Sequence, residues 1–163
     1  MLIGATVQIF FIPLFGALSD RYGRRPVYLA GAIGAAAWVF AFFALLDTGV
    51  FALVVLATVV ALVFHAAMYA TQASIIAEMF PTRIRYSGAS MGYQLAGILG
   101  GALAPIIATA LLGAYRSSLA VSIYVVAVLA VTVVCVLLAR ETSRVDIAAE
   151  DTAYRATGLP AER

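Results

Sequence analysis

The chain has 163 residues, of which 64% are hydrophobic and 11% are charged, and its mean hydropathy is +1.05. Soluble domains are about half apolar and about a quarter charged, so this composition excludes an ordinary soluble globular protein. The formal net charge is only +2, and the ten basic residues, all arginine, are spread along the chain. That distribution argues against a nucleic-acid-binding surface.

Five apolar runs follow one another along the chain. A helix that crosses a bilayer needs about 20 apolar residues, and each run is long enough, the first only just. The runs lack the polar face of a soluble helical bundle, and they lack the two-residue alternation of a membrane β-strand. We therefore expect an all-α, polytopic membrane protein with five transmembrane helices. The predicted spans are residues 2–18, 27–46, 50–77, 89–112 and 118–139, within a membrane domain of residues 1–142.

The two ends of the chain differ from the spans. Met1 leads directly into the first run, without the positive segment or the small-residue cleavage site of a signal peptide. This start predicts a truncated or split polypeptide. Residues 143–163 have mixed charge with Ala, Thr, Gly and Pro, so we expect a cytosolic tail that is mostly disordered.

A charged loop, GALSDRYGRRP, joins the first two runs at residues 16–26. Gly16 would let the end of the first span approach another helix closely. Asp20 could accept hydrogen bonds at a helix N-terminus, Gly23 would permit a tight turn, and Pro26 suits the first turn of the next helix. The alternative is an ordinary loop of arginines with an incidental acid.

Arginines mark one side of the membrane. The opposite loops contain only Asp47 and Arg116, and positive residues close to span ends stay in the cytoplasm. We therefore expect the N-terminus outside and the C-terminus inside, in the inner or plasma membrane of the cell. The arginines on the predicted cytoplasmic side are Arg21, Arg24, Arg25, Arg83, Arg85, Arg140 and Arg144.

Polar side chains inside the spans are candidates for a transport path. Residues at i, i+4 and i+7 share one helix face, as His65, Tyr69 and Gln72 do in the third run. No carboxylate lies near the middle of a span, so any proton-coupling acid belongs to the missing half of the protein unless His65 serves. The alternative role for these residues is hydrogen bonding between helices. The candidate cavity residues, called the cavity set below, are Gln8, His65, Tyr69, Gln72, Tyr93 and Gln94.

The fourth run is rich in glycine. Small residues four apart let helices touch, and a proline introduces a bend, so this span is suited to close packing, to flexing, or to both. The residues that carry this prediction are Gly88, Gly92, Gly97, Gly101 and Pro105, to which Gly16 and Gly23 of the first loop are added.

Three stretches together resemble the major facilitator superfamily. The loop at residues 16–26 is similar to its loop signature, which occurs after the second and eighth spans. AEMFPTRIRYSG, at residues 77–88, resembles the E-x-F-P-T-x-x-R-x-x-G junction between spans ten and eleven of sugar and metabolite porters. GASMGYQLAGILGGALAPIIATALL, at residues 88–112, is similar to the metabolite:proton symporter branch, which includes permeases for dicarboxylates, citrate, shikimate and proline/betaine. The resemblance implies that the five runs correspond to spans eight to twelve of a C-terminal half.

The resemblance also implies a mechanism. Facilitators enclose a midplane site between two six-helix halves that rock against each other. Charged residues at the cytoplasmic ends would then form a network that closes the inner gate, which we call the latch. The alternative is a set of solvated interfacial charges. The expected latch residues are Asp20, Arg21, Arg24, Arg25, Glu78, Arg83 and Arg85.

The function expected from the resemblance is the C-terminal part of a proton-coupled symporter of small polar metabolites that works by alternating access. Its partners would be the bilayer, a metabolite, a proton and a missing or separately encoded N-terminal half, without which the chain is expected to be inactive. The alternative is a non-transporting membrane subunit or relic that packs against another membrane protein. No catalytic residue, metal or cofactor is expected, because the chain lacks paired catalytic groups and ligand motifs.

Overall fold

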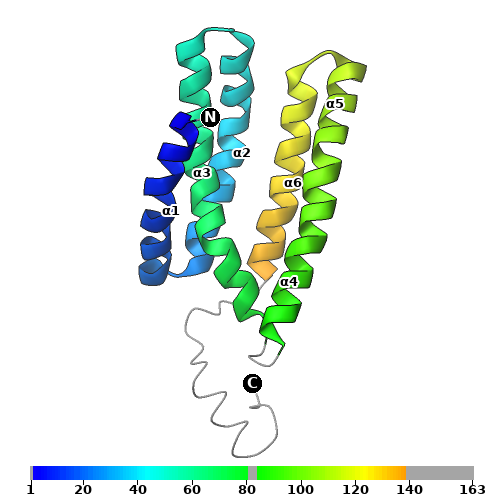
Figure 1. The fold of residues 1–163 in the computed structure, drawn as a ribbon. Coiled ribbons are helices and arrows are strands. Elements are labelled where there is room, and N and C mark those ends of the chain that lie inside the picture. The colour runs from blue at the N-terminus through cyan, green and yellow to red at the C-terminus, as the bar shows by residue number, and fades with distance from the viewer. Residues whose placement is uncertain (1, 81–83, 139–163) are drawn as a thin grey trace, which may run out of the picture.

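The computed structural model describes residues 2–80 and 84–138, and these residues form helices without strands (Figure 1). A π-helical segment interrupts the fourth of five long helical rods. The elements are α1 (Leu2–Tyr22), α2 (Arg24–Asp47), α3 (Phe51–Glu78), α4 (Arg85–Ala96), the π-helical segment (Gly97–Ala102), α5 (Leu103–Tyr115) and α6 (Ser118–Leu138).

The helices confirm the all-α membrane fold class. Within the described residues, four helical stretches are long and apolar enough to cross a membrane, and α1, with 21 residues, is not one of the four. α1, α2 and the rod from α4 to α5 extend past the predicted apolar runs, because a helix can continue into polar residues beyond its apolar span. The predicted tail at residues 143–163 lies outside the described residues. The four stretches are Arg24–Asp47, Phe51–Ala77, Arg85–Tyr115 and Ser118–Leu138.

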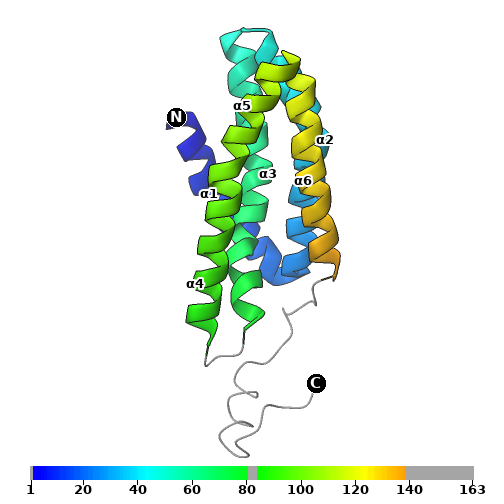
Figure 2. The same ribbon diagram turned by 90° about the vertical axis from the view of Figure 1, so that its right-hand side faces the viewer.

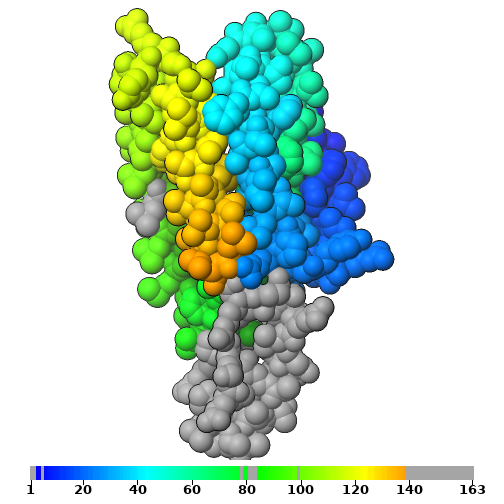
Figure 3. Space-filling view, turned by 180° about the vertical axis from the view of Figure 1, so that it is seen from behind, coloured from blue at the N-terminus to red at the C-terminus, as the bar shows by residue number. Residues whose placement is uncertain are grey.

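The helices pack as two layers. α1 contacts α2 and α3, α4 contacts α3, and α5 contacts α6, which in turn packs on α2. Viewed from behind, α2 and α6 lie side by side (Figure 3). In the opposite view, α3 lies between α1 and α4 (Figure 1). Among the described helices, α1 does not contact α4, α5 or α6, so the layer of α1, α3 and α4 is held together through α3.

Small residues build the contact between α2 and α3. Ala57 of α3 is fully buried, and its carbonyl accepts a hydrogen bond from Trp38 Nε1 of α2 at 3.2 Å. A Cβ atom added to Gly31 would lie 3.0 Å from the carbonyl oxygen of Phe64, so the missing side chain allows the two backbones to approach closely. In a bilayer, where neighbouring lipid is as apolar as the helices, this close packing is a main source of helix association.

The connections alternate between the two ends of the bundle. α1 and α3 end, and α2 and α4 begin, at one end of the bundle, and the α2–α3 and α5–α6 connections lie at the other (Figure 1). Gly23 alone separates α1 from α2, and its φ of 101° is a conformation that residues with a side chain rarely adopt. The tight turn that the sequence predicts at Gly23 is therefore present, with one residue between the two helices.

Candidate functional site

A polar contact joins α1 to α3 on an exposed face of the chain. Gln8 Nε2 lies 3.0 Å from His65 Nδ1, and the two residues are 57 positions apart in the chain. The His65 ring stacks on the ring of Tyr69, with centroids 5.7 Å apart and planes inclined by 20°. His65 is near the middle of α3 and is exposed. Three members of the cavity set therefore form one connected cluster at the depth where a midplane site would lie.

The same face of α3 continues into a hollow. His65, Tyr69, Ala73 and Ile76 are at i, i+4, i+8 and i+11, which places them on one stripe of a helix with 3.6 residues per turn. A hollow of about 290 Å³ begins where this stripe meets α4. Its lining residues are Ala73, Ile76, Ala89, Ser90, Tyr93 and Gln94.

The structure thus places the cavity set along one surface. Gln8, His65 and Tyr69 are in contact, and Tyr93 and Gln94 of α4 line the hollow further along the α3 stripe. Gln72, a half-buried residue, lies on the same stripe. Three amides, an imidazole and two phenols along one open surface offer hydrogen-bond donors and acceptors to a small polar molecule.

A second hollow has a different character. It has a volume of about 370 Å³ and lies among α1, α2 and α3, and most of its lining is apolar, including Phe15, Val27 and Phe64. A polar metabolite would lose its hydrogen bonds to water there without replacement, at a cost of about 1–3 kcal/mol for each polar group. The surface with His65 is therefore the better candidate site.

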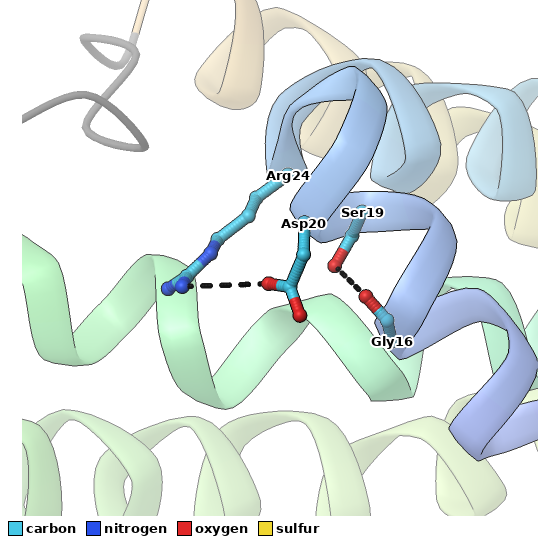
Figure 4. A network of polar contacts seen from close by, with 4 residues as sticks. All are labelled: Gly16, Ser19, Asp20 and Arg24. Atoms are coloured by element: carbon cyan, nitrogen blue, oxygen red, sulfur yellow. Dashed lines mark hydrogen bonds and ion pairs between the residues drawn. The ribbon is translucent and has the colours of Figure 1, made fainter.

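The charged loop forms an ion pair on the bundle end. Arg24, the first residue of α2, lies 3.8 Å from Asp20 of α1 across the turn at Gly23, and the Asp20 side chain is 73% exposed (Figure 4). The hydroxyl of the buried Ser19 donates to the carbonyl of Gly16 at 2.7 Å, which ties the last turns of α1 together. An exposed ion pair of this kind contributes only about 0–1 kcal/mol to stability. Because its side chain is mostly exposed, the Asp20 carboxylate is also accessible to another partner.

Arg85 has a different role in this structure. Its Nε donates to the carbonyls of Ala77 and Phe80, at 2.9 and 3.2 Å. An arginine at this position adds hydrogen bonds to carbonyls at and just beyond the C-terminal end of α3. Arg83 and the side chain of Glu78 lie outside the described residues, so the latch stays a prediction.

Two contacts that sequence reasoning missed join α2 to α6. Arg25, at the start of α2, donates to the carbonyl of Leu137 near the end of α6. At the other end, Ser118, the first residue of α6, donates to the Asp47 carboxylate at 2.7 Å. Arg25 thus contacts the negative, C-terminal end of the α6 dipole, and Asp47 contacts its positive, N-terminal end. The sequence carries the charges but does not reveal that these two helices are neighbours.

The predicted packing glycines mostly face outward. A Cβ atom added to Gly16, Gly92, Gly97 or Gly101 would meet nothing within 4 Å in this chain, and one at Gly88 would collide with the Phe80 ring. Their predicted packing partner is therefore not another described helix.

The bend expected at Pro105 stays a prediction, and the same rod contains a π-helical segment. The π-helical segment Gly97–Ala102 lies directly before α5, in a rod that continues from α4 to α5 beside α6 (Figure 2). π-helical turns of this kind occur frequently at functional sites.

The sequence matches known proteins along most of its length. The model of the Major Facilitator Superfamily matches residues 1–159. The shikimate transporter of Escherichia coli K12 is 34% identical over 146 residues, which are 88% of this chain and 33% of that protein. The citrate-proton symporter of Klebsiella pneumoniae is 34% identical over 112 residues, covering 68% of this chain and 25% of that protein.

A proline/betaine transporter of Escherichia coli K12 is 28% identical over 136 residues, which are 83% of this chain and 27% of that protein. This chain thus spans about a third or less of the length of these relatives. No solved structure matches it. The loop signature at residues 16–26, the helical membrane fold and the match over residues 1–159 agree, and the chain belongs to the major facilitator superfamily.

Proposed function

We propose that this chain is the C-terminal part of a secondary active transporter that carries small polar metabolites by alternating access. The observation that carries the proposal is that Gln8 contacts His65, and that the α3 stripe with His65 and Tyr69 leads to the hollow lined by Tyr93 and Gln94. Polar side chains at membrane depth are costly, and in membrane proteins they mark substrate and ion pathways. The names of the relatives, which are transporters of shikimate, citrate with a proton, and proline or betaine, support the same function.

The substrate class follows from the chemistry of this surface. Amide, phenol and imidazole groups hydrogen-bond to carboxylates and hydroxyls, and the cavity set contributes no charge that would repel an anion. Because the middle of each predicted span lacks aspartate and glutamate, we propose that a proton is carried by His65 or by a group in the rest of the transporter. The substrate class is thus a small metabolite with hydroxyl or carboxylate groups.

A second half is needed to enclose this surface. The face formed by α1, α3 and α4 is open in the chain by itself, and a facilitator site lies between two halves. Outward-facing Gly92, Gly97 and Gly101 on the π-helical rod would allow another helix to approach closely. We propose that an N-terminal half, on the same polypeptide or a separate one, covers this face.

The position of the arginines sets the proposed orientation. The connections that carry Arg24 and Arg85 lie at one end of the bundle, and Asp47 and Arg116 lie at the other (Figure 1). By the positive-inside rule, the arginine-rich end faces the cytoplasm and the N-terminus lies outside. The proposed location is the cell membrane.

Cysteine labelling tests this orientation. Thr48 and Ser87 are exposed at opposite ends of the bundle, so single cysteines there, with Cys135 replaced by alanine, report the two sides. In intact cells, an impermeant thiol reagent should label position 48 and spare position 87. Both sites should react once the membrane is opened. Labelling of position 87 in intact cells would reverse the proposed orientation.

The transport proposal is tested by substrate protection. The test uses the completed transporter, which is this chain joined to the parts of the Escherichia coli shikimate transporter outside the matched region. Tyr69 is 47% exposed on the proposed substrate face, and Ile33 of α2 is 57% exposed on another helix. A transported metabolite should slow thiol labelling of Tyr69→Cys and leave labelling of Ile33→Cys unchanged.

The two cysteine variants form a matched pair because both sites are apolar or aromatic, exposed and near mid-helix. Both variants are made in a chain from which Cys135 has been removed. Shikimate, citrate and betaine serve as the probe metabolites. Labelling of position 69 at the same rate with and without a transported metabolite would contradict the proposal. It would favour a non-transporting subunit that packs against another membrane protein.

A further inference from the structure

The contact between Gln8 and His65 has a chemical direction. The Gln8 amide nitrogen can only donate a hydrogen bond, and it lies 3.0 Å from Nδ1 of His65. Nδ1 must then accept with its lone pair, so the ring proton of a neutral imidazole is on Nε2. The partner of one ring nitrogen thus determines the chemistry of the other.

The Tyr69 ring stacks against the imidazole on one side. The two rings lie 5.7 Å apart and are inclined by only 20°, which restricts the rotation that would exchange the ring nitrogens. Among the residues that the structure describes, none accepts a hydrogen bond from Nε2, and the His65 side chain is exposed. The Nε2–H group is therefore a preorganised donor on the open face of α3.

We propose that Gln8 is a positioning residue that holds His65 in the Nε2–H tautomer, so that Nε2–H donates to a carboxylate oxygen of the substrate. This inference rests on the proposed function. A neutral N–H donor bonding to a carboxylate forms a charge-assisted hydrogen bond. The opposite tautomer would present a lone pair to the same oxygen and repel it. Gln8 therefore selects for an acceptor group at this point of the substrate.

The tautomer can be measured in this chain without transport, because His65 is its only histidine. The chain is labelled with ¹⁵N in the imidazole ring, placed in lipid nanodiscs, and studied by NMR about two pH units above the ordinary imidazole pKa of about 6.5. Protonated and unprotonated ring nitrogens have well-separated ¹⁵N shifts. We expect Nε2 to carry the proton and Nδ1 to lack it.

Two substitutions change the partner of Nδ1 in opposite ways. Gln8→Leu keeps the volume but removes the donor, so the Nε2–H tautomer should lose its predominance. Gln8→Glu replaces the donor with an acceptor, so a proton should appear on Nδ1. The control is Thr132→Val on α6, whose hydroxyl bonds only within its own helix, and this variant should leave the imidazole spectrum unchanged. Circular dichroism establishes that each variant keeps its helices.

Transport kinetics test the substrate contact. In the completed transporter, Gln8→Leu should raise the KM for a carboxylate substrate about tenfold, the factor expected when one hydrogen bond to a charged group is weakened. It should leave the KM for a transported substrate without a carboxylate nearly unchanged. An equal rise for both substrates would overturn the contact with the carboxylate.

The positioning role of Gln8 and the proposed transport function are contradicted by different results. A wild-type ring with its proton on Nδ1, or a tautomer that Gln8→Leu leaves unchanged, would overturn the positioning role. An Nε2–H ring in a completed transporter that inserts correctly but takes up no metabolite would overturn the proposed function, and with it the substrate contact.

Discussion

Replacing His65 with phenylalanine is expected to lower metabolite uptake by the completed transporter about tenfold or more. Phenylalanine keeps the ring that stacks on Tyr69, at 5.7 Å, but removes both ring nitrogens. The substitution deletes the bond to Gln8 and the donor proposed for the substrate. Losing one hydrogen bond to a charged group costs about 1.5–3 kcal/mol, and 1.4 kcal/mol corresponds to a factor of ten.

The measurement is initial uptake rate in membranes that contain equal amounts of inserted protein. Thr132→Val is the matched control because it also removes one polar group from a helix, but α6 does not contact α3. This control should keep nearly wild-type uptake. Uptake by His65→Phe at the control rate would show that the imidazole takes no part in transport.

The apolar runs predicted the fold well for a physical reason. In a bilayer each helix must satisfy its own backbone hydrogen bonds, so the length of an apolar run nearly determines a helix. The predicted runs at 27–46 and 118–139 agree with α2 (Arg24–Asp47) and α6 (Ser118–Leu138) to within a few residues. The fourth run differs more, because α4 begins at Arg85, in a polar segment that helical hydrogen bonding includes and hydropathy does not.

The polar surface was predictable only in part. The i, i+4, i+7 spacing places His65, Tyr69 and Gln72 on one face, because that relation is local to α3. The Gln8–His65 bond joins residues 57 positions apart, and spacing along the chain contains no information about that distance in space. The sequence suggested that Gln8 faces the same cavity, and the structure adds the contact itself.

Contacts between helices were beyond sequence reasoning for the same reason. Arg25 and Asp47 lie at opposite ends of α2, and both bond to α6, which begins 71 residues after Asp47. The sequence places Arg25 among the expected latch residues and gives Asp47 no role except orientation. Likewise, the glycine spacing of the fourth run predicts close packing there, whereas Gly31 makes the close approach between α2 and α3.

The chain by itself is expected to transport nothing. Its polar surface would face lipid without a second half, and each polar group left unsatisfied there costs about 1 kcal/mol or more. Tyr69 and Tyr93, both on this surface, are 47% and 48% exposed in the chain. That exposure favours association of two copies through their polar surfaces, or capture of a separate N-terminal half.

Gradient-driven uptake in proteoliposomes tests the central claim most directly. The chain is reconstituted alone and, in parallel, as the completed transporter, with labelled dicarboxylates, shikimate and betaine under an inwardly directed proton gradient. We predict uptake of at least one metabolite by the completed transporter, its loss when the gradient is collapsed, and no uptake by the chain alone. Uptake by the chain alone, or none by a completed transporter that is correctly inserted, would contradict this account.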